Sequence, residues 1–109
     1  MAETLESALK VRLRAVLDSQ PVTEAELRRL FEEGRACALI LSGWLEKEEL
    51  RLARLAADPA AALADMADAL RGVNELRPGL AELHELLAEL NTRAREFRAS
   101  WLAVADTAR

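Results

Sequence analysis

The chain is poor in the residues that build catalytic and metal sites. It has one histidine, His84, and one cysteine, Cys37. A single cysteine cannot form an internal disulfide bond, which fits a reducing compartment. Pairs of a nucleophile and a base, and the di-iron sites of helical bundles, need further histidines or cysteines at set spacings. We therefore expect no catalytic residues, no metal site and no cofactor, and we expect that the protein is not an enzyme.

Long apolar runs are also missing. The longest, Ala36–Leu41, is far too short to cross a bilayer, which takes about 20 apolar residues. The first residues do not show the charged segment and apolar stretch of a secretory signal. The sequence thus predicts a cytoplasmic protein without membrane insertion.

Lysine is nearly absent, since the only two lysines are Lys10 and Lys47 and the other basic residues are arginines. Acidic residues outnumber basic ones, and the net charge is −4. A negative chain repels the phosphates of nucleic acids and anionic lipids, so nucleic acid is not an expected partner. The bias toward arginine and alanine is typical of a GC-rich bacterial genome.

Leucine and alanine are abundant, and in the last third of the chain they follow a helical spacing. Apolar residues recur there in alternating steps of four and three, the a/d pattern of a helix that lies along another helix. The members of this seam are Leu76, Leu80, Leu83, Leu87, Leu90, Ala94, Phe97, Trp101 and Val104. With Pro78 at its first position, the spacing predicts a long helix over about 78–106.

A second seam predicts another long helix over about 23–57. Thr23 and Glu26 form a capping box at its start. The seam runs from Leu27 to Leu55 and is apolar except at Glu48. Whether Gly43 breaks this helix stays open at the level of sequence.

Two shorter helices complete the prediction. The first covers about 3–19 and is stopped by Gln20-Pro21, because a residue before proline is disfavoured in the α region. The other covers about 59–71, with Asp58-Pro59 at its start and Gly72 at its end. Short connections favour antiparallel neighbours. We therefore predict an all-α fold, an antiparallel bundle of about four helices in a single domain spanning 1–109.

Apolar residues off the two seams exceed what a narrow helix contact needs. They are Leu30, Leu39, Ile40, Trp44, Leu86 and Leu102, together with Trp101 on the seam. Surplus apolar surface rich in tryptophan is typical of contact sites. These residues predict binding to a protein partner or to a second copy of the chain in a homodimer; a well-filled four-helix core is the alternative interpretation.

The plan of a small, acidic bundle with a long last helix resembles bacterial flagellar and type III export chaperones, and Leu83–Phe97 carries the local similarity. This resemblance implies a chaperone or adaptor for a secreted partner. A different alternative is a small enzyme or metal-binding bundle that uses His84 with the nearby carboxylates of Glu82 and Glu85.

Overall fold

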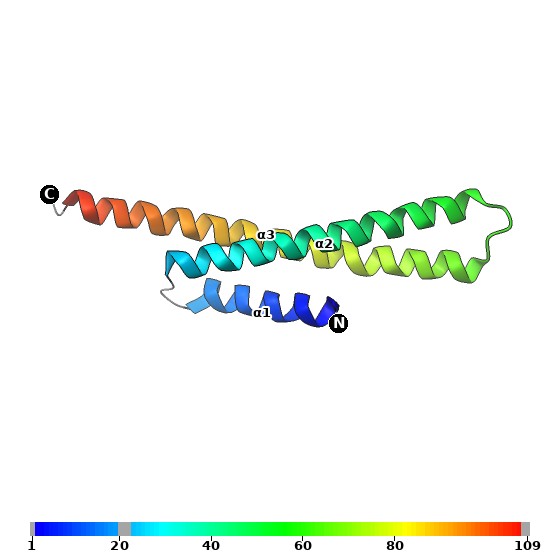
Figure 1. Cartoon of the computed structure of the whole chain (residues 1–109), viewed down its shortest axis with the longest axis horizontal. Coiled ribbons are helices and arrows are strands. Elements are labelled where there is room, and N and C mark those ends of the chain that lie inside the picture. The colour runs from blue at the N-terminus through cyan, green and yellow to red at the C-terminus, as the bar shows by residue number, and fades with distance from the viewer. Residues whose placement is uncertain (1, 20–22, 108–109) are drawn as a thin grey trace.

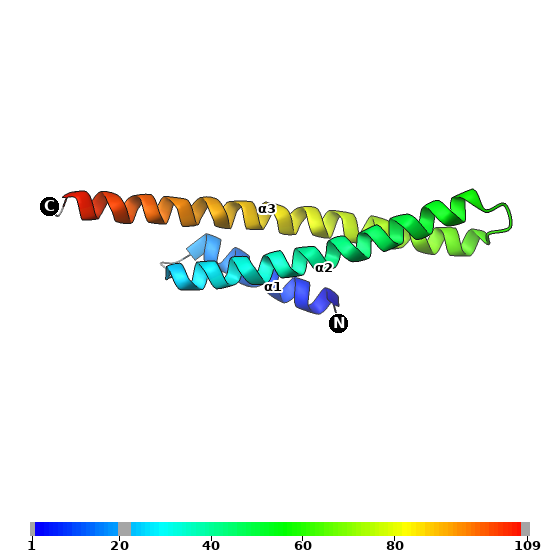
Figure 2. The ribbon, with the colours of Figure 1, turned by 45° about the horizontal axis from the view of Figure 1, so that its top comes forward.

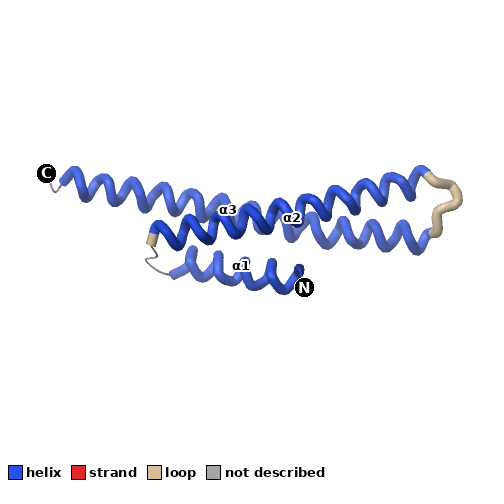
Figure 3. The backbone as a smooth tube through the Cα atoms, viewed as in Figure 1, coloured by secondary structure: helices blue, strands red, loops and turns tan. Residues whose placement is uncertain are grey.

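In the part of the chain that the structure describes, the fold is all-helical, with three helices: α1 (Ala2–Ser19), α2 (Glu24–Ala57) and α3 (Leu63–Thr107) (Figures 1 and 3). The computed structural model describes residues 2–19 and 23–107, and the side chains of 6–18 and 23–104. Helices α2 and α3 form a long antiparallel hairpin, and α1 lies along the half that is distant from the hairpin loop (Figures 1 and 2). The result is a rod with dimensions of 74 × 22 × 16 Å.

Helix α2 follows its prediction closely. Thr23 is its N-cap, and the Thr23 Oγ1 accepts a hydrogen bond of 3.1 Å from the backbone N–H of Glu26. Gly43 does not break the helix, which continues to Ala57. Leu27 and Leu41 of the predicted seam are buried against α3, so this seam forms the hairpin contact.

The predicted count of four helices is wrong, because residues 63–71 and 78–106 belong to one helix, α3, and residues 59–62 lie in the loop before it. The physical reason is that the apolar seam does not stop at Leu76. Upstream of it, Val73 and Ala69 are buried and Met66 is half-buried, again in steps of three and four. One unbroken helix keeps all these side chains facing α2.

The residues expected to interrupt α3 have other roles. Gly72 makes room for a neighbour, since a Cβ there would lie 3.1 Å from the Glu48 Oε2. Likewise, a Cβ on Gly79 would lie 2.8 Å from the Glu6 Oε1. Pro78 sits inside the helix on the exposed side, where the missing N–H removes one hydrogen bond without burying an unpaired group. Packing of the continuous seam therefore outweighs these helix breakers.

The connection between α2 and α3 begins at Asp58, the C-cap of α2. Its side chain does not cap a helix that starts at Pro59, as the sequence suggested. Instead, the Asp58 Oδ1 accepts a bond of 2.9 Å from the N–H of Ala60, and the Asp58 carbonyl accepts one of 3.1 Å from Ala61. These bonds close a tight turn before α3 starts at Leu63.

The core lies where all three helices meet. Its buried side chains are Leu9, Leu13, Leu27, Leu30, Ala38, Leu41, Leu80, Leu83, Leu86, Leu87 and Leu90. Gly34 allows α2 and α3 to approach closely, because a Cβ there would overlap the Leu87 Cδ2. The three-helix half is thus the densely packed part of the rod.

Polar contacts fix α1 on this half. The buried Lys10 Nζ lies 2.5 Å from the Glu6 Oε1 on its own helix and 3.4 Å from the Glu82 Oε2 on α3. Arg14 also pairs with Glu82. Near the end of α1, the Arg93 guanidinium donates a hydrogen bond of 2.8 Å to the Leu17 carbonyl.

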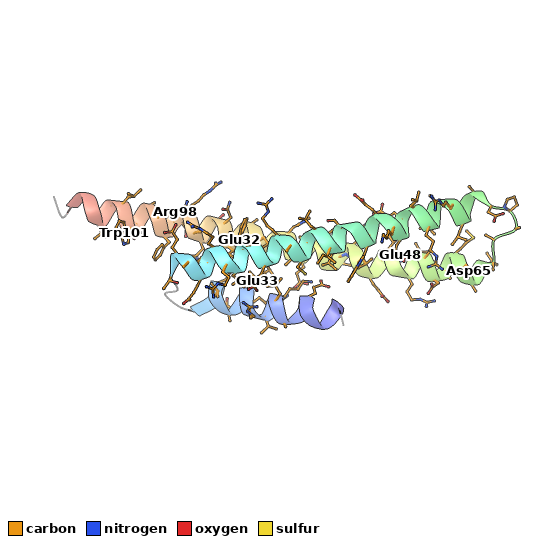
Figure 4. All side chains as sticks on the ribbon, viewed as in Figure 1. Glu32, Glu33, Glu48, Asp65, Arg98 and Trp101 are labelled. Carbon is orange, nitrogen blue, oxygen red and sulfur yellow. The ribbon has the colours of Figure 1, made fainter. Side chains whose placement is uncertain are left out.

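The half of the hairpin near the loop has only two helices, α2 and α3. Its surface on the same side of the hairpin as α1 is charged. The recess beyond the start of α1 is lined by Glu6, Glu48, Arg51, Asp68, Arg71, Gly72, Glu75 and Leu76. Arg51 bridges the two helices at 3.1 Å from the Asp68 Oδ2, and Figure 4 shows Glu48 between the same helices. A third helix with an apolar face would find no matching surface there.

Candidate functional site

An apolar groove runs between α1 and α2, with a volume of about 550 Å³. We call it the α1–α2 groove. Its lining residues are Ala8, Leu9, Arg12, Glu33, Ala36, Cys37, Ile40, Leu41 and Trp44. Leu9 and Leu41 are buried and form its floor, whereas Ile40 is 54% exposed at its edge. The groove is therefore the outer surface of the three-helix core.

Helix α2 supplies most of the groove because it carries a second apolar stripe. Ala36, Leu39, Ile40, Gly43 and Trp44 follow the i, i+3, i+4, i+7, i+8 spacing of one helix face. This face is directed away from α3, and Leu39 is 72% exposed. A helix with apolar residues on two faces needs cover on both, and within the described residues only one face has it.

Charged residues mark one wall of the groove. The Arg12 guanidinium lies 2.9 Å from the Glu33 Oε2, an ion pair that joins α1 to α2, and Glu33 lies between these helices in Figure 4. Both side chains are exposed, so the pair contributes little to stability. It instead supplies a polar boundary beside an apolar strip, the arrangement of many small binding sites.

Cys37 lies in the groove as a protonated thiol. Burial raises the pKa of Cys37 above its ordinary value, and the nearby negative charge of Glu6 raises it further, against the opposing effect of Lys10. A thiol with a raised pKa is a poor nucleophile near neutral pH. Cys37 therefore serves the groove as a small apolar side chain.

The predicted contact residues divide into three groups. Leu39, Ile40 and Trp44 lie together on the outward stripe of α2. Leu30 and Leu86 do not belong to any exposed surface, because both are buried in the core. Trp101 and Leu102 are exposed but lie apart from this stripe, near the end of α3, where Figure 4 labels Trp101.

Sequence reasoning missed the contribution of α1 to the groove, namely Ala8 and Arg12. Periodicity identifies the apolar face of each helix, but it does not state which face of α2 lies next to α1. The available signal was the sevenfold spacing of Leu30 and Cys37 beside the α2 seam, since Leu30 is buried in the core and Cys37 lines the groove with α1 residues.

His84 and its neighbours form no obvious metal site. His84 is exposed, and Glu82 pairs with Lys10 and Arg14. Across residues 2–19 and 23–107, no group of three or more histidine, cysteine, aspartate or glutamate side chains is placed to hold a metal ion. In the same part of the chain, no helix has the length and apolar character needed to cross a membrane.

The chain matches no protein-family model, no curated protein and no solved structure. The resemblance to export chaperones therefore depends on the overall plan of the bundle and on Leu83–Phe97. In the structure this stretch begins with Leu83, Leu87 and Leu90, which are buried core residues. Their spacing reflects the α2–α3 contact, so the function has to be argued from the geometry of the groove.

Proposed function

We propose that this protein is a non-enzymatic interaction module, an adaptor, chaperone or regulatory subunit, that binds a protein partner in the α1–α2 groove. The observation that carries the proposal is the outward apolar stripe of α2 beside α1, on which Ile40 and Trp44 are exposed. A tryptophan at the edge of an apolar groove is a common energetic anchor in protein interfaces.

An amphipathic helix is the ligand that suits this groove best. Helices α1 and α2 lie side by side (Figures 1 and 2). A helix of the partner that packs between them would be the fourth helix of a bundle with α1, α2 and α3. Helix-in-groove binding uses apolar anchors at i, i+3, i+4 and i+7, the same spacing as the stripe on α2.

An export chaperone is the more specific form of this proposal. The bound helix would then belong to a secreted partner that is kept in a binding-competent state until it is exported. A cytoplasmic location is part of this proposal, as the sequence predicts. Its support is the overall plan of a small, acidic helical bundle with a long last helix.

The experiment compares partner capture by wild-type protein, Ile40→Glu and Trp44→Ala from a lysate of the source organism, with Cys37 as an internal reporter. We expect both substitutions to reduce capture at least about tenfold. In alkaline buffer, where part of the Cys37 thiol is ionised, the captured partner should slow its alkylation by iodoacetamide, because this thiol lies in the groove.

Leu63→Glu is the matched control, since Leu63 is also exposed but lies at the first residue of α3, by the loop. It should leave capture and Cys37 protection unchanged. A partner that binds Ile40→Glu as tightly as wild type, or that leaves Cys37 fully reactive, would show that the groove is not the binding site.

A further inference from the structure

Helix α1 runs parallel to α3 and covers a defined surface of the hairpin (Figures 1 and 2). Toward the start of α1, the Glu6 carboxylate lies beside Gly79 of α3. Toward its end, the Leu17 carbonyl lies beside Arg93 of α3. We call the covered surface the α1-binding face; it consists of Cys37 and Leu41 on α2 and of Gly79, Glu82, Leu86 and Arg93 on α3.

The centre of the α1-binding face is apolar. Leu9 and Leu13 of α1, four residues apart, are buried in the same core as Leu86. Glu6 contacts Gly79, which fixes the register of the two parallel helices. Two helical turns further along both helices, this register sets Leu13 opposite Leu86. The face therefore accepts a pair of apolar side chains at positions i and i+4.

Glu82 gives the α1-binding face a preference for positive charge. Its Oε2 lies 3.4 Å from the Lys10 Nζ, and its carboxylate also pairs with Arg14. In α1, each of these two cations follows one of the two buried leucines directly in sequence. One carboxylate of α3 thus interacts with two basic side chains, one turn apart, on the helix that it faces.

Arg93 recognises the end of the bound helix. Its guanidinium donates a hydrogen bond of 2.8 Å to the Leu17 carbonyl. Helix α1 ends at Ser19, so this carbonyl is one of the last four, which have no donor within their own helix. A cation at this position also favours the partial negative charge of a helix C-terminus. The face therefore selects the direction of the helix as well as its charge.

The hairpin has its own contacts, and α1 adds few side chains to them. Among the side chains of residues 6–18, only Leu9, Lys10 and Leu13 are buried. Helices α2 and α3, in contrast, pack directly on each other, as Gly34 does against Leu87. Replacing α1 by another helix would therefore leave the contact between α2 and α3 in place.

We propose that the α1-binding face is a second binding surface, for an amphipathic helix of a partner protein, and that α1 occupies it in the free protein as a built-in competitor. The partner helix carries two apolar residues four positions apart, a basic residue directly after each, and a C-terminal end that reaches Arg93. Because α1 is tethered, it competes at an effective concentration on the order of 1 mM. A partner that displaces it therefore makes contacts in addition to those of α1.

This proposal goes beyond the function proposed for the α1–α2 groove and does not depend on it. The groove exists only while α1 is docked, because Ala8 and Arg12 form one side of it. The α1-binding face is open only after α1 has left. A partner in the groove would therefore hold α1 in place, whereas a partner on the α1-binding face would expel it.

The test uses a fluorescein-labelled peptide with the sequence of residues 2–19, and its binding to the full-length chain is followed by fluorescence anisotropy. Wild-type protein should bind it weakly, because its own α1 is tethered on the face. In the double variant Lys10→Glu/Arg14→Glu, two carboxylates of α1 face Glu82 and are repelled by it. Its own α1 should leave, so we expect this variant to bind the peptide at least about tenfold more tightly than wild type.

Adding Glu82→Lys to this double variant reverses the charge of the α1-binding face. Its own α1, with carboxylates at positions 10 and 14, should then dock again, and the basic residues of the peptide should be repelled. The affinity for the peptide should fall again by at least about tenfold. A gain in binding caused only by a loosened fold would not follow the charge at position 82.

Val11→Glu is the matched control, since Val11 lies on α1 but is 62% exposed; this variant should bind the peptide as weakly as wild type. Circular dichroism should show that the hairpin stays helical in Lys10→Glu/Arg14→Glu. The proposal is overturned if this variant binds the peptide no better than wild type, if Glu82→Lys has no effect, or if the hairpin unfolds once α1 is released. Partner capture that is indifferent to Ile40→Glu would count against the groove alone.

Discussion

Glycine has opposite roles at two positions of α2. Gly34 is buried where a Cβ would overlap Leu87, and Leu87 is itself held in the core. Gly43 has no atom within 4 Å of the position of a Cβ. The same residue type is thus required for packing at one site and only weakens the helix at the other.

We expect Gly34→Ala to lower the free energy of unfolding by about 1–3 kcal/mol, because overpacking forces the Leu87 side chain from its position. Gly43→Ala should raise it by about 0.5–1 kcal/mol, because alanine favours the helix and meets no neighbour. Urea unfolding followed by circular dichroism measures both, and each variant is the control for the other. Equal effects of the two substitutions would contradict the close α2–α3 contact at Gly34.

The raised pKa of Cys37 makes stability depend on pH in one direction. Because the pKa is higher in the folded than in the unfolded protein, the thiol's contribution is fully present below the unfolded value of about 8.5 and is lost as the pH rises through the folded value. We expect the free energy of unfolding of wild type, compared with Cys37→Ser, to fall above about pH 8.5. Parallel pH profiles for the two proteins would contradict this expectation.

At the scale of elements, the attachment of α1 to the hairpin depends more on the ion pairs of Lys10 than on the ion pair of Arg12 with Glu33. Lys10 is buried between Glu6 and Glu82, whereas Arg12 and Glu33 form an exposed pair. Removing the charge of Lys10 leaves the little-exposed Glu6 carboxylate without a compensating charge. Removing the charge of Arg12 leaves Glu33 in contact with water.

Lys10→Met should therefore destabilise the protein by about 1–3 kcal/mol, and Arg12→Ala by less than about 1 kcal/mol. Hydrogen exchange of the α1 amides should quicken clearly in Lys10→Met alone. If both variants exchange alike, Lys10 does not hold α1 in place.

Pro78 gives a second test at this scale, because it lies inside a continuous α3. Pro78→Ala restores an N–H and removes the contact of the proline ring with the preceding turn, so we expect about 1–3 kcal/mol of added stability. Pro59→Ala is the control: Pro59 lies in the loop, where losing proline should reduce stability by at most about 1 kcal/mol. A loss of stability in Pro78→Ala would indicate that the helix is broken at this position.

Pro78 and Gly72 also explain where prediction from sequence failed. The capping of α2 by Thr23 and the seam from Leu27 were readable, because both depend on neighbours in the chain. Helix breakers are local signals too, but here the tertiary contact of Val73 with α2 overrides them. The position of α1, and with it Ala8 and Arg12 in the groove, depends on side-chain fit between distant segments, which periodicity does not encode.

For the whole molecule, the long hairpin sets the shape. The radius of gyration is 19.4 Å over Cα atoms, compared with about 13 Å for a compact domain of this length. Scattering from dilute protein should give a radius near the larger value. A value near 13 Å would mean that the hairpin folds back on itself.

The rod is three helices thick where α1 lies along the hairpin and two helices thick toward the loop, so its resistance to opening is graded along its length. Beyond Gly72 toward the loop, few side chains are buried, and solvent-exposed ion pairs such as Arg51–Asp68 provide much of the contact. Local unfolding should begin there and spread inward, and added salt should widen it. Thermal breathing would thus be confined to the loop half, while the half that carries the groove stays ordered.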